Sequence, residues 1–465
     1  MFPAVPEAAL AELGRTEGGA DTLALLGRDQ DTRRLLLLRA VLDAVQAAEP
    51  GICPPATKAR LREDWALLTA ADRAASSSPA RERLRYPLTG AWARSCLTGL
   101  GPGGTGPHAQ DRRRELARDL AYFSALAAVA AARAGIPFTT ELTARDGVLV
   151  LPSLGMLHTA EGGDARVRVT YSRGRITLDQ VSVYLENGTG AWSGSLAWTS
   201  AYALPGLVAD AESVPLDDLD PYRVPGRVPD QFGLSGPVAP DDHERKRWLQ
   251  NWSGTAAVLR SGGEERLTEV LALLRCLVPL EMPPAAGGRG SCSGTSREAF
   301  GALLSSAPVT PVAFAATLVH ELQHAKLTAL SEMVELHRAG PAARYFAPWR
   351  PDPRPYDGLL QGTYSYLALA DFFQRRALTG DPARSEGAWA SFARCHAQVG
   401  AALPALAGSP DLTAVGRRFV DEMTATHERL AERPAPRGDT ARAQAYVKAA
   451  RVLWTQRRPR GESRK

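Results

Sequence analysis

The sequence predicts an α+β protein that is predominantly helical, with a small antiparallel sheet near the middle of the chain. Apolar residues recur with helical spacing towards both ends, whereas short β-branched runs separated by turn dipeptides lie between them. One long run of helix-forming residues in the C-terminal half carries the sequence His-Glu-Leu-Gln-His. With 465 residues the chain is too long for one ordinary core, so we expect two or three domains.

The first two regions differ in their periodicity. Residues 1–135 are expected to form an N-terminal helical region, with helices over 31–49, 57–71 and 109–134. Residues 136–208 are expected to form the small antiparallel β region, because short β-branched runs are bounded there by Asp-Gly, Gly-Gly, Arg-Gly and Asn-Gly. These runs cover 138–142, 148–151, 167–171, 176–178 and 181–185, and 167–178 is predicted to be a hairpin that turns across Ser172, Arg173 and Gly174.

The second half is predicted to be helical again. Residues 209–242 are rich in Pro and Asp and predict an irregular linker or lid. Residues 243–456 predict a helical metal-binding domain, and residues 457–465 a basic, disordered tail. The helices expected in this domain cover 245–261, 264–280, 310–340, 358–377, 386–406, 413–433 and 439–456. A glycine- and hydroxyl-rich loop at 281–295 either lies over the metal site or is a flexible surface loop.

The run 310–340 is the centre of the predicted site. Pro311 stands where a first helical residue is expected, and Gly340 follows the last turn. Apolar side chains surround this helix, which indicates that it is buried. His320 and His324 are four residues apart, so they share one face about 6 Å apart along the axis. One metal ion can accept a nitrogen from each at about 2.1 Å, and Glu321 can reach its open side or a bound water.

Burial favours a metal centre at these residues. Two histidines and a carboxylate are costly inside an apolar helix unless they are paired or bind a metal. The other interpretation is a pair of core histidines with satisfied hydrogen bonds. A metal centre needs a further ligand, and Glu332 is excluded because eight residues after His324 place it about 12 Å along the helix. Asp357 and Gln361 are the candidates, although Asp357 is equally explained as a helix N-cap.

Composition excludes several other classes of protein. The net charge is +5, but acids and bases are interleaved, so no nucleic-acid-binding patch is indicated. No window approaches 18 consecutive apolar residues, and the N-terminus lacks the pattern of a signal peptide. The five cysteines are scattered without a CxxC pair, which argues against a disulfide framework and a zinc ribbon. A reduced bacterial cytoplasm is the expected setting, and the oligomeric state is not indicated.

Three segments resemble a known family. They are Leu-Val-His-Glu-Leu-Gln-His-Ala-Lys-Leu, Ala-Pro-Trp-Arg-Pro-Asp-Pro-Arg-Pro and Gly-Leu-Leu-Gln-Gly-Thr-Tyr, all within residues 290–375. Together they resemble the HEXXH-motif peptide-modification proteins that accompany clusters for ribosomally made, modified peptides. The resemblance implies an iron(II) and 2-oxoglutarate-dependent oxygenase that β-hydroxylates residues of a precursor peptide.

The resemblance also implies roles for particular residues. His320 and His324 would be iron ligands, and the family often has a third His at the position of Gln361. The distal carboxylate of 2-oxoglutarate suits an arginine fork, for which Arg350 and Arg354 are candidates unless both pair with Asp352. Hydroxyl donors to this co-substrate would come from Ser293, Thr295 or Tyr364.

Two other functions are compatible with the same motif. In a zinc metallopeptidase, Glu321 would be the general base on a zinc-bound water. In a non-catalytic peptide-binding protein, the site would have decayed, consistent with Gln361. In the oxygenase, Glu321 would instead orient a ligand or the co-substrate.

Overall fold

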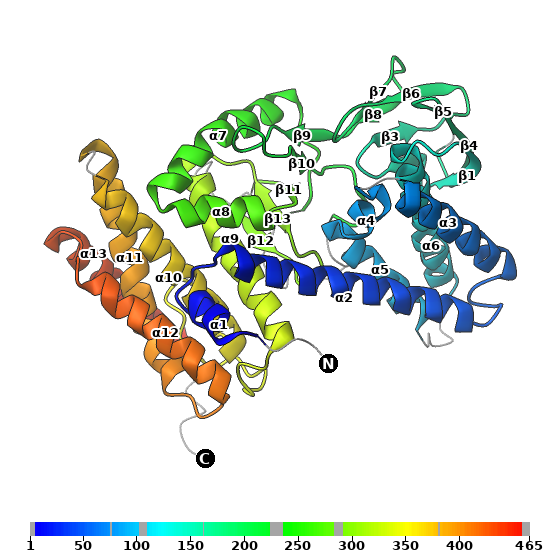
Figure 1. Ribbon diagram of the computed structural model, residues 1–465. Helices are drawn as coiled ribbons and strands as arrows, with labels where there is room; N and C mark the ends of the chain where they lie inside the picture. Colours follow the sequence, from blue (N-terminus) through cyan, green and yellow to red (C-terminus); the bar gives the residue numbers. More distant parts are fainter. Residues whose placement is uncertain are drawn as a thin grey trace. The chain divides into compact units, whose positions relative to one another are not determined.

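The computed structural model describes residues 5–74, 77–101, 109–160, 162–223, 236–282, 292–379 and 382–457. The chain is an α+β protein, predominantly helical and with small antiparallel sheets (Figure 1). Its contacts divide it into two compact units. We call Met1–Asp29, Gln250–Leu274 and Pro308–Lys465 the helical unit, and Gln30–Leu249 with Arg275–Ala307 the sheet unit.

These units are discontinuous in sequence, unlike the contiguous regions that the sequence predicted. The first helix, α1 (Glu7–Gly14), belongs with the C-terminal helices, because the Tyr364 hydroxyl donates to the Leu13 carbonyl at 2.6 Å. Residues 275–307 belong with the strands, because they add three strands to a sheet begun before residue 217. Of the predicted linker or lid at 209–242, residues 224–235 lie outside the described part, as do residues 458–465 of the predicted tail.

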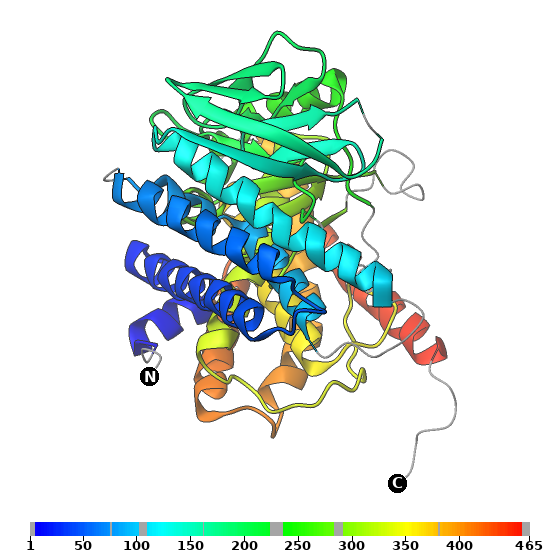
Figure 2. The same ribbon diagram turned by 90° about the vertical axis from the view of Figure 1, so that its right-hand side faces the viewer.

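In the sheet unit, helices cover one face of an antiparallel sheet. The helix α6 (Ala109–Arg133) lies between this sheet and α3 (Pro55–Ala74) (Figure 2). Its alanine-rich half is buried, because small side chains let the helix approach the strands closely. The remaining helices are α4 (Pro79–Leu84), α5 (Pro87–Leu100) and those parts of α2 (Ala20–Ala47) and α7 (Asp242–Ser261) that belong to this unit.

The predicted hairpin is confirmed within this sheet, whose strand order is β1-β4-β5-β6-β7. Ser172 pairs with Arg175 in antiparallel register, and φ is positive at both Arg173 (51°) and Gly174 (77°). Two consecutive positive φ angles are typical of the type I′ turn that closes two-residue hairpins. The strands are β1 (Phe138–Ala144), β4 (Ala165–Ser172), β5 (Arg175–Leu178), β6 (Val181–Leu185) and β7 (Ala191–Trp192).

Two further sheets complete this unit, and one of them was not predicted. The three-stranded sheet has the order β2-β3-β8, and the five-stranded mixed sheet the order β12-β13-β11-β10-β9. The predicted helix 264–280 is wrong at its end, because α8 (Glu264–Leu273) is followed by the strand β11 (Cys276–Leu280). All five residues of β11 are buried, and such a short apolar run has no periodicity that separates strand from helix. The other strands are β2 (Val148–Leu151), β3 (Gly155–His158), β8 (Trp198–Ser200), β9 (Tyr202–Leu204), β10 (Val214–Leu216), β12 (Ser293–Thr295) and β13 (Ala302–Ser306).

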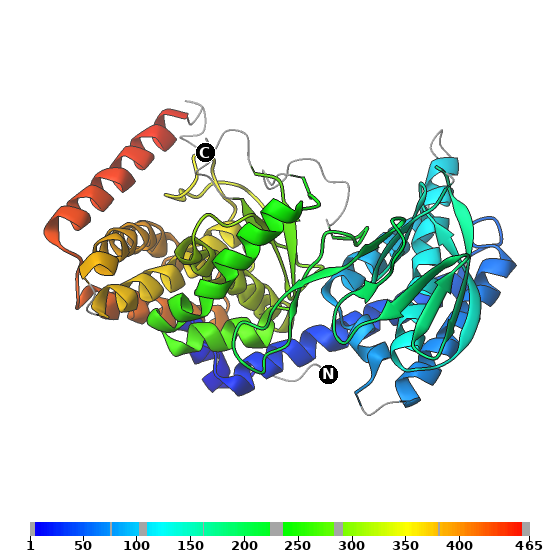
Figure 3. The same cartoon turned by 90° about the horizontal axis from the view of Figure 1, so that it is seen from above.

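The helical unit is a stack of helices around two long central ones, α9 (Pro311–Met333) and α10 (Tyr356–Leu378). The helix α10 contacts α9 on one side and α11 (Pro382–Ala407) on another. The helices α12 (Ala414–Ala431) and α13 (Arg437–Arg457) pack on α11 (Figure 3). The core of the helical unit includes Phe314, Leu318, Leu322, Leu367, Phe372, Phe392 and Phe419.

The helix α9 begins as predicted but ends earlier. The Thr310 hydroxyl accepts a hydrogen bond from the Ala313 amide at 3.1 Å, and Pro311 is the first helical residue. The helix stops at Met333 rather than near Gly340, because the chain there becomes extended and pairs with the segment before α12. The Thr413 amide donates to the Leu336 carbonyl at 3.0 Å, and this contact replaces the next helical turn.

None of the described helices is long and apolar enough to cross a membrane. All five cysteines are free and buried.

Candidate functional site

His320 and His324 meet on the face of α9 that is turned towards α10. Their Nε2 atoms are 3.1 Å apart, and their ring planes are inclined at 81°. Two nitrogen atoms that each lie about 2.1 Å from one ion, at an angle of about 90 to 110°, are about 3.0 to 3.4 Å apart. The two Nε2 atoms are therefore spaced as two ligands of one metal ion would be, and a hydrogen bond between the rings gives the same spacing. Both residues are partly exposed.

Gln361 contacts the other ring nitrogen of His324. Its side-chain oxygen lies 3.0 Å from Nδ1, while its amide nitrogen donates to the Thr328 hydroxyl at 3.3 Å. With the side-chain oxygen of Gln361 facing the ring, Nδ1–H donates to Gln361 and Nε2 keeps its lone pair. This is the tautomer that a metal ion bound at Nε2 requires. Gln361 thus supports His324 here, whereas the sequence suggested it as a third ligand.

The environment of His320 keeps its ring neutral. Burial, and then repulsion from His324, lower the pKa of His320 well below its ordinary value. Neutral imidazole is the form that binds metals.

An aromatic wall stands beside His320. The Tyr366 ring meets the His320 ring edge-on with centroids 5.3 Å apart, and Trp349 stacks on Tyr366 at 4.9 Å. Gly362 makes this possible, because a Cβ there would lie 2.3 Å from the Trp349 ring. Burial raises the pKa of Tyr366 to about 12, so its hydroxyl stays protonated and can donate a hydrogen bond.

A network of buried ion pairs links α9 with α8 and α10. Lys326 on α9 and Arg266 on α8 share the carboxylate of Glu269, and Arg266 also pairs with Asp371 of α10 at 3.1 Å. The Gln323 amide donates to Glu269 at 3.2 Å. Because Gln323 and Lys326 flank His324 in sequence, this network fixes the rotation of the helix that carries the histidine pair.

Two predicted residues lie away from the pair. Asp357 is in the first turn of α10 but is not its N-cap, which is Pro355, and its carboxylate lies 3.6 Å from His337. The Tyr364 hydroxyl donates to the Leu13 carbonyl and is fully buried, so it points towards α1. Residues three apart on a helix diverge by about 60°, which is enough to separate Tyr364 from Gln361.

The predicted co-substrate residues have other partners. Arg350 and Arg354 both pair with Asp352, at 3.0 and 3.5 Å, which is the alternative that the sequence left open. Ser293 belongs to β12 of the sheet unit, so its role stays a prediction. Glu321 is buried on α9, and its charge contributes to the raised pKa of Tyr366, for which burial is the main cause.

Within the described part of the chain, the histidine pair has no third ligand. Among the residues that the structure describes, no group of three or more His, Cys, Asp or Glu side chains is placed to hold a metal ion. The sequence analysis also missed Trp349, Tyr366 and Thr328 as neighbours of the histidines. One signal was present for Trp349, because a glycine inside an apolar helix, here Gly362, indicates close approach of another group.

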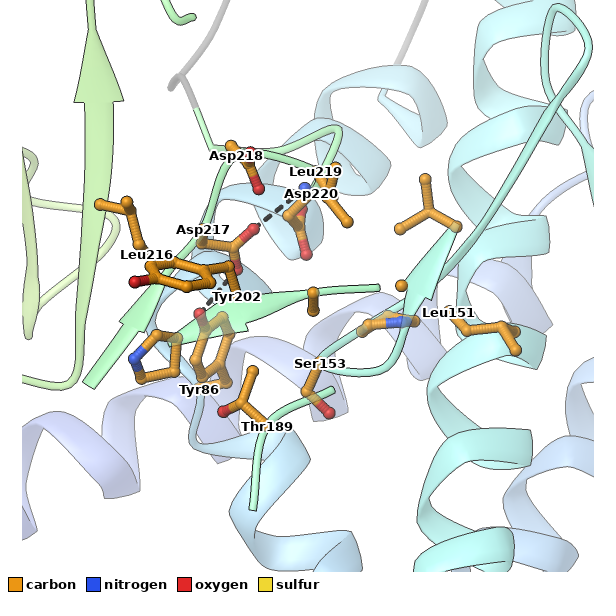
Figure 4. A pocket seen from close by; sticks show the side chains of 15 residues that line it. Tyr86, Leu151, Ser153, Thr189, Tyr202, Leu216, Asp217, Asp218, Leu219 and Asp220 are labelled. Carbon is orange, nitrogen blue, oxygen red and sulfur yellow. Dashed lines mark hydrogen bonds between the residues drawn. The ribbon is translucent and has the colours of Figure 1, made fainter. Parts of the chain in front are cut away.

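A small pocket lies in the sheet unit (Figure 4). Tyr86 donates its hydroxyl hydrogen to Asp217 at 2.6 Å, and the Asp220 amide donates to the other oxygen of the same carboxylate at 3.0 Å. Its volume of about 20 Å³ suits a single water molecule. This pocket is therefore too small for a substrate.

No model of a known protein family matches the chain, and no curated protein is similar to it.

Proposed function

We propose that this protein is a metal-dependent enzyme that modifies a ribosomally made peptide, by iron(II) and 2-oxoglutarate-dependent hydroxylation of amino-acid side chains. The observation that carries the metal part of the proposal is the 3.1 Å separation of two Nε2 atoms on one helix. The choice of iron, of 2-oxoglutarate and of a peptide substrate comes from the resemblance of residues 290–375 to the HEXXH-motif family.

The described residues supply two of the ligands that such a metal needs. His320 and His324 would hold the ion, Gln361 would orient His324, and the remaining positions would be open to water or co-substrate. A bound iron(II) ion would supply the oxidising chemistry with dioxygen and 2-oxoglutarate. The protein would supply positioning, because the half-buried Trp349 and Tyr366 form a flat surface beside His320 on which a peptide side chain can lie.

A zinc metallopeptidase is the second candidate, favoured by the burial of Glu321. A buried carboxylate next to a metal-binding histidine suits a general base that removes a proton from water. In the hydroxylase no water needs to be deprotonated, so Glu321 would only orient its neighbours.

The test is reconstitution of the purified protein with iron under anaerobic conditions, followed by 2-oxoglutarate, air and the small peptide encoded beside its gene. Hydroxylation adds one oxygen atom to the peptide and converts 2-oxoglutarate to succinate and carbon dioxide. We expect this mass gain, with metal binding abolished in His320→Ala and His324→Ala while both stay folded.

The variant Glu321→Gln separates the two enzymes. A hydroxylase should lose about 10- to 100-fold in rate, whereas a peptidase should lose nearly all cleavage while zinc still binds. Peptide cleavage would refute the hydroxylase, full metal occupancy in both alanine variants would refute the site, and metal binding without either reaction would indicate a non-catalytic peptide-binding protein.

A further inference from the structure

A groove of about 540 Å³ lies between α11, α12 and α13 in the helical unit. This size falls in the range of ligand sites, roughly 300 to 1,000 Å³. None of the residues that line it belongs to the histidine pair of α9 or its surroundings. Figure 3 shows α13, the last described helix, beside α11 at the edge of this unit.

The floor of the groove is apolar. Phe392 and Ala393 of α11 are buried there, and Ala435 closes it from the segment between α12 and α13. Ala397, Pro434 and Val447 extend this surface towards its mouth. A ligand would therefore bury an apolar group of its own against this floor.

A stacked pair of histidines forms the wall between α11 and α12. The rings of His396 and His427 are 4.0 Å apart and nearly parallel at 9°. Each Nε2 lies 3.1 to 3.2 Å from the backbone carbonyl of the other histidine, so each Nε2–H donates and each neutral ring keeps Nδ1 as an acceptor. Burial, and then His427, lower the pKa of His396 to about 4, so the wall is polar but uncharged near neutral pH.

The charge of the groove comes from α13 alone. Lys448 and Arg451 are three residues apart and line the same side, and no acidic residue is among those that line the groove. The Arg451 guanidinium lies over the Phe346 ring at 4.5 Å and donates from Nη2 to the Ala401 carbonyl at 3.5 Å, so its other N–H groups remain able to bind an anion. In the described part of the chain neither Lys448 nor Arg451 forms an ion pair with a carboxylate.

We propose that this groove binds a carboxylate joined to an apolar group, with the apolar group on Phe392 and Ala435 and the carboxylate at Lys448 and Arg451. Such a ligand is either a free amphipathic acid or an acidic residue next to an apolar one in a peptide. The inference does not depend on the proposed hydroxylase, because no residue of the α9 site contributes to it.

Titration calorimetry with the full-length protein tests the inference and separates the two sources. The probes are decanoate and acetyl-Leu-Glu-Leu-amide, each compared with its uncharged partner, decanamide or acetyl-Leu-Gln-Leu-amide. We expect one acid to bind at least tenfold more tightly than its amide. Lys448→Glu should weaken that binding at least tenfold, and Ala397→Leu should weaken it by filling the groove.

The control is Arg437→Glu, which makes the same charge change on an exposed residue of α13 outside the groove. Binding of decanoate alone identifies a free amphipathic acid, and binding of the tripeptide alone identifies a peptide ligand. The inference is overturned if neither acid binds at millimolar concentration, if the amides bind as tightly, or if Arg437→Glu weakens binding as much as Lys448→Glu.

Discussion

Each ring nitrogen of His324 contacts a different side chain. Nε2 faces His320, while Nδ1–H is held by the Gln361 oxygen, and Gln361 is itself held by Thr328. The hydrogen bond from Nδ1–H to the Gln361 oxygen leaves the lone pair on Nε2. Spacing along the chain could predict the two histidines, because four residues make one helical turn, but it could not predict on which nitrogen Gln361 would act.

Replacing Gln361 by Leu should lower metal affinity without removing it. The Leu side chain preserves most of the volume but no longer fixes the tautomer and orientation of His324, a loss that usually costs about 10- to 100-fold in affinity. Competition with a chelating dye measures the dissociation constant. Thr328→Val should have a smaller effect, because it removes only the indirect support. Equal affinity in Gln361→Leu and the wild type would show that this hydrogen bond does not tune the site.

The buried carboxylate of Glu269 should matter for stability rather than for chemistry. Burial opposes its ionisation, yet Lys326 and Arg266 outweigh that effect and lower the pKa of Glu269. Glu269→Gln would remove the carboxylate with which Lys326 pairs and would leave Arg266 paired with Asp371. Breaking a buried pair in this way costs about 3 to 5 kcal/mol.

Urea unfolding measures the loss in Glu269→Gln, and Glu335→Gln is the matched control. Glu335 pairs with Arg338 at 2.9 Å, but both side chains are more than half exposed, so its removal should leave the unfolding midpoint unchanged. Similar midpoints for the two variants would contradict a stabilising role of the buried network.

Sequence periodicity predicted most of the helices and several of the strands. The remaining elements depend on close packing within the folded chain. The strands Val148–Leu151 and Val181–Leu185 have the predicted bounds, because turn residues mark both of their ends. The strand Cys276–Leu280 was missed, because it is buried on both faces and has no alternation. The early end of α9 depends on a pairing with residues about 80 positions later, as the Thr413 contact with Leu336 shows.

Two glycines inside helices should respond oppositely to alanine. Gly27 in α2 has no atom within 4 Å of the position that a Cβ would take, so Gly27→Ala should stabilise the protein by about 0.5 to 1 kcal/mol. At Gly362 the new methyl would lie 2.3 Å from the Trp349 ring, and the indole must move away. Overpacking of this kind costs about 1 to 3 kcal/mol, which outweighs the gain in helix propensity.

Thermal unfolding, combined with quenching of tryptophan fluorescence by acrylamide, tests the two glycine variants. Gly362→Ala should lower the midpoint and expose Trp349 to the quencher, and Gly27→Ala should do neither. An unchanged quenching profile in Gly362→Ala would mean that Trp349 is not held against α10 in solution.

At the scale of the whole molecule, the chain crosses between its two compact units several times. The helices α2 and α7 each have residues in both units, and residues 275–307 return to the sheet unit between α8 and α9. A sequence read in order suggests contiguous domains, since composition changes gradually along the chain. The grouping depends on the parallel pairing of β10 with β11, at Leu216 and Leu277, a long-range contact that no local pattern encodes.

The sheet unit should show its own dependence on pH. Asp220 is buried and accepts hydrogen bonds from the Tyr122 hydroxyl and from the Tyr222 amide at 2.8 Å. Burial, and then the charge of Asp217, raise the pKa of Asp220 to about 7. Because an unfolded Asp has a pKa of about 3.9, the folded state binds an additional proton between about pH 4 and pH 7.

The direction in which the folding stability changes with pH follows from this difference in proton binding. The stability that protonated Asp220 contributes is fully present below about pH 4 and is lost as the pH rises through 7.

Asp220→Asn removes this dependence, because the amide is uncharged at every pH and keeps one acceptor and one donor. Relative to the wild type, the free energy of unfolding of Asp220→Asn should therefore rise by about 1 to 3 kcal/mol between pH 5 and pH 8. Urea unfolding at the two pH values, followed by the fluorescence of Trp92, which packs against Tyr122 with ring centroids 6.1 Å apart, measures this difference. Asp43→Asn on the exposed part of α2 should differ from the wild type by the same amount at both pH values. If the difference for Asp220→Asn is equally constant, Asp220 is already ionised in the folded protein at pH 5, and Arg223 or solvent compensates its charge.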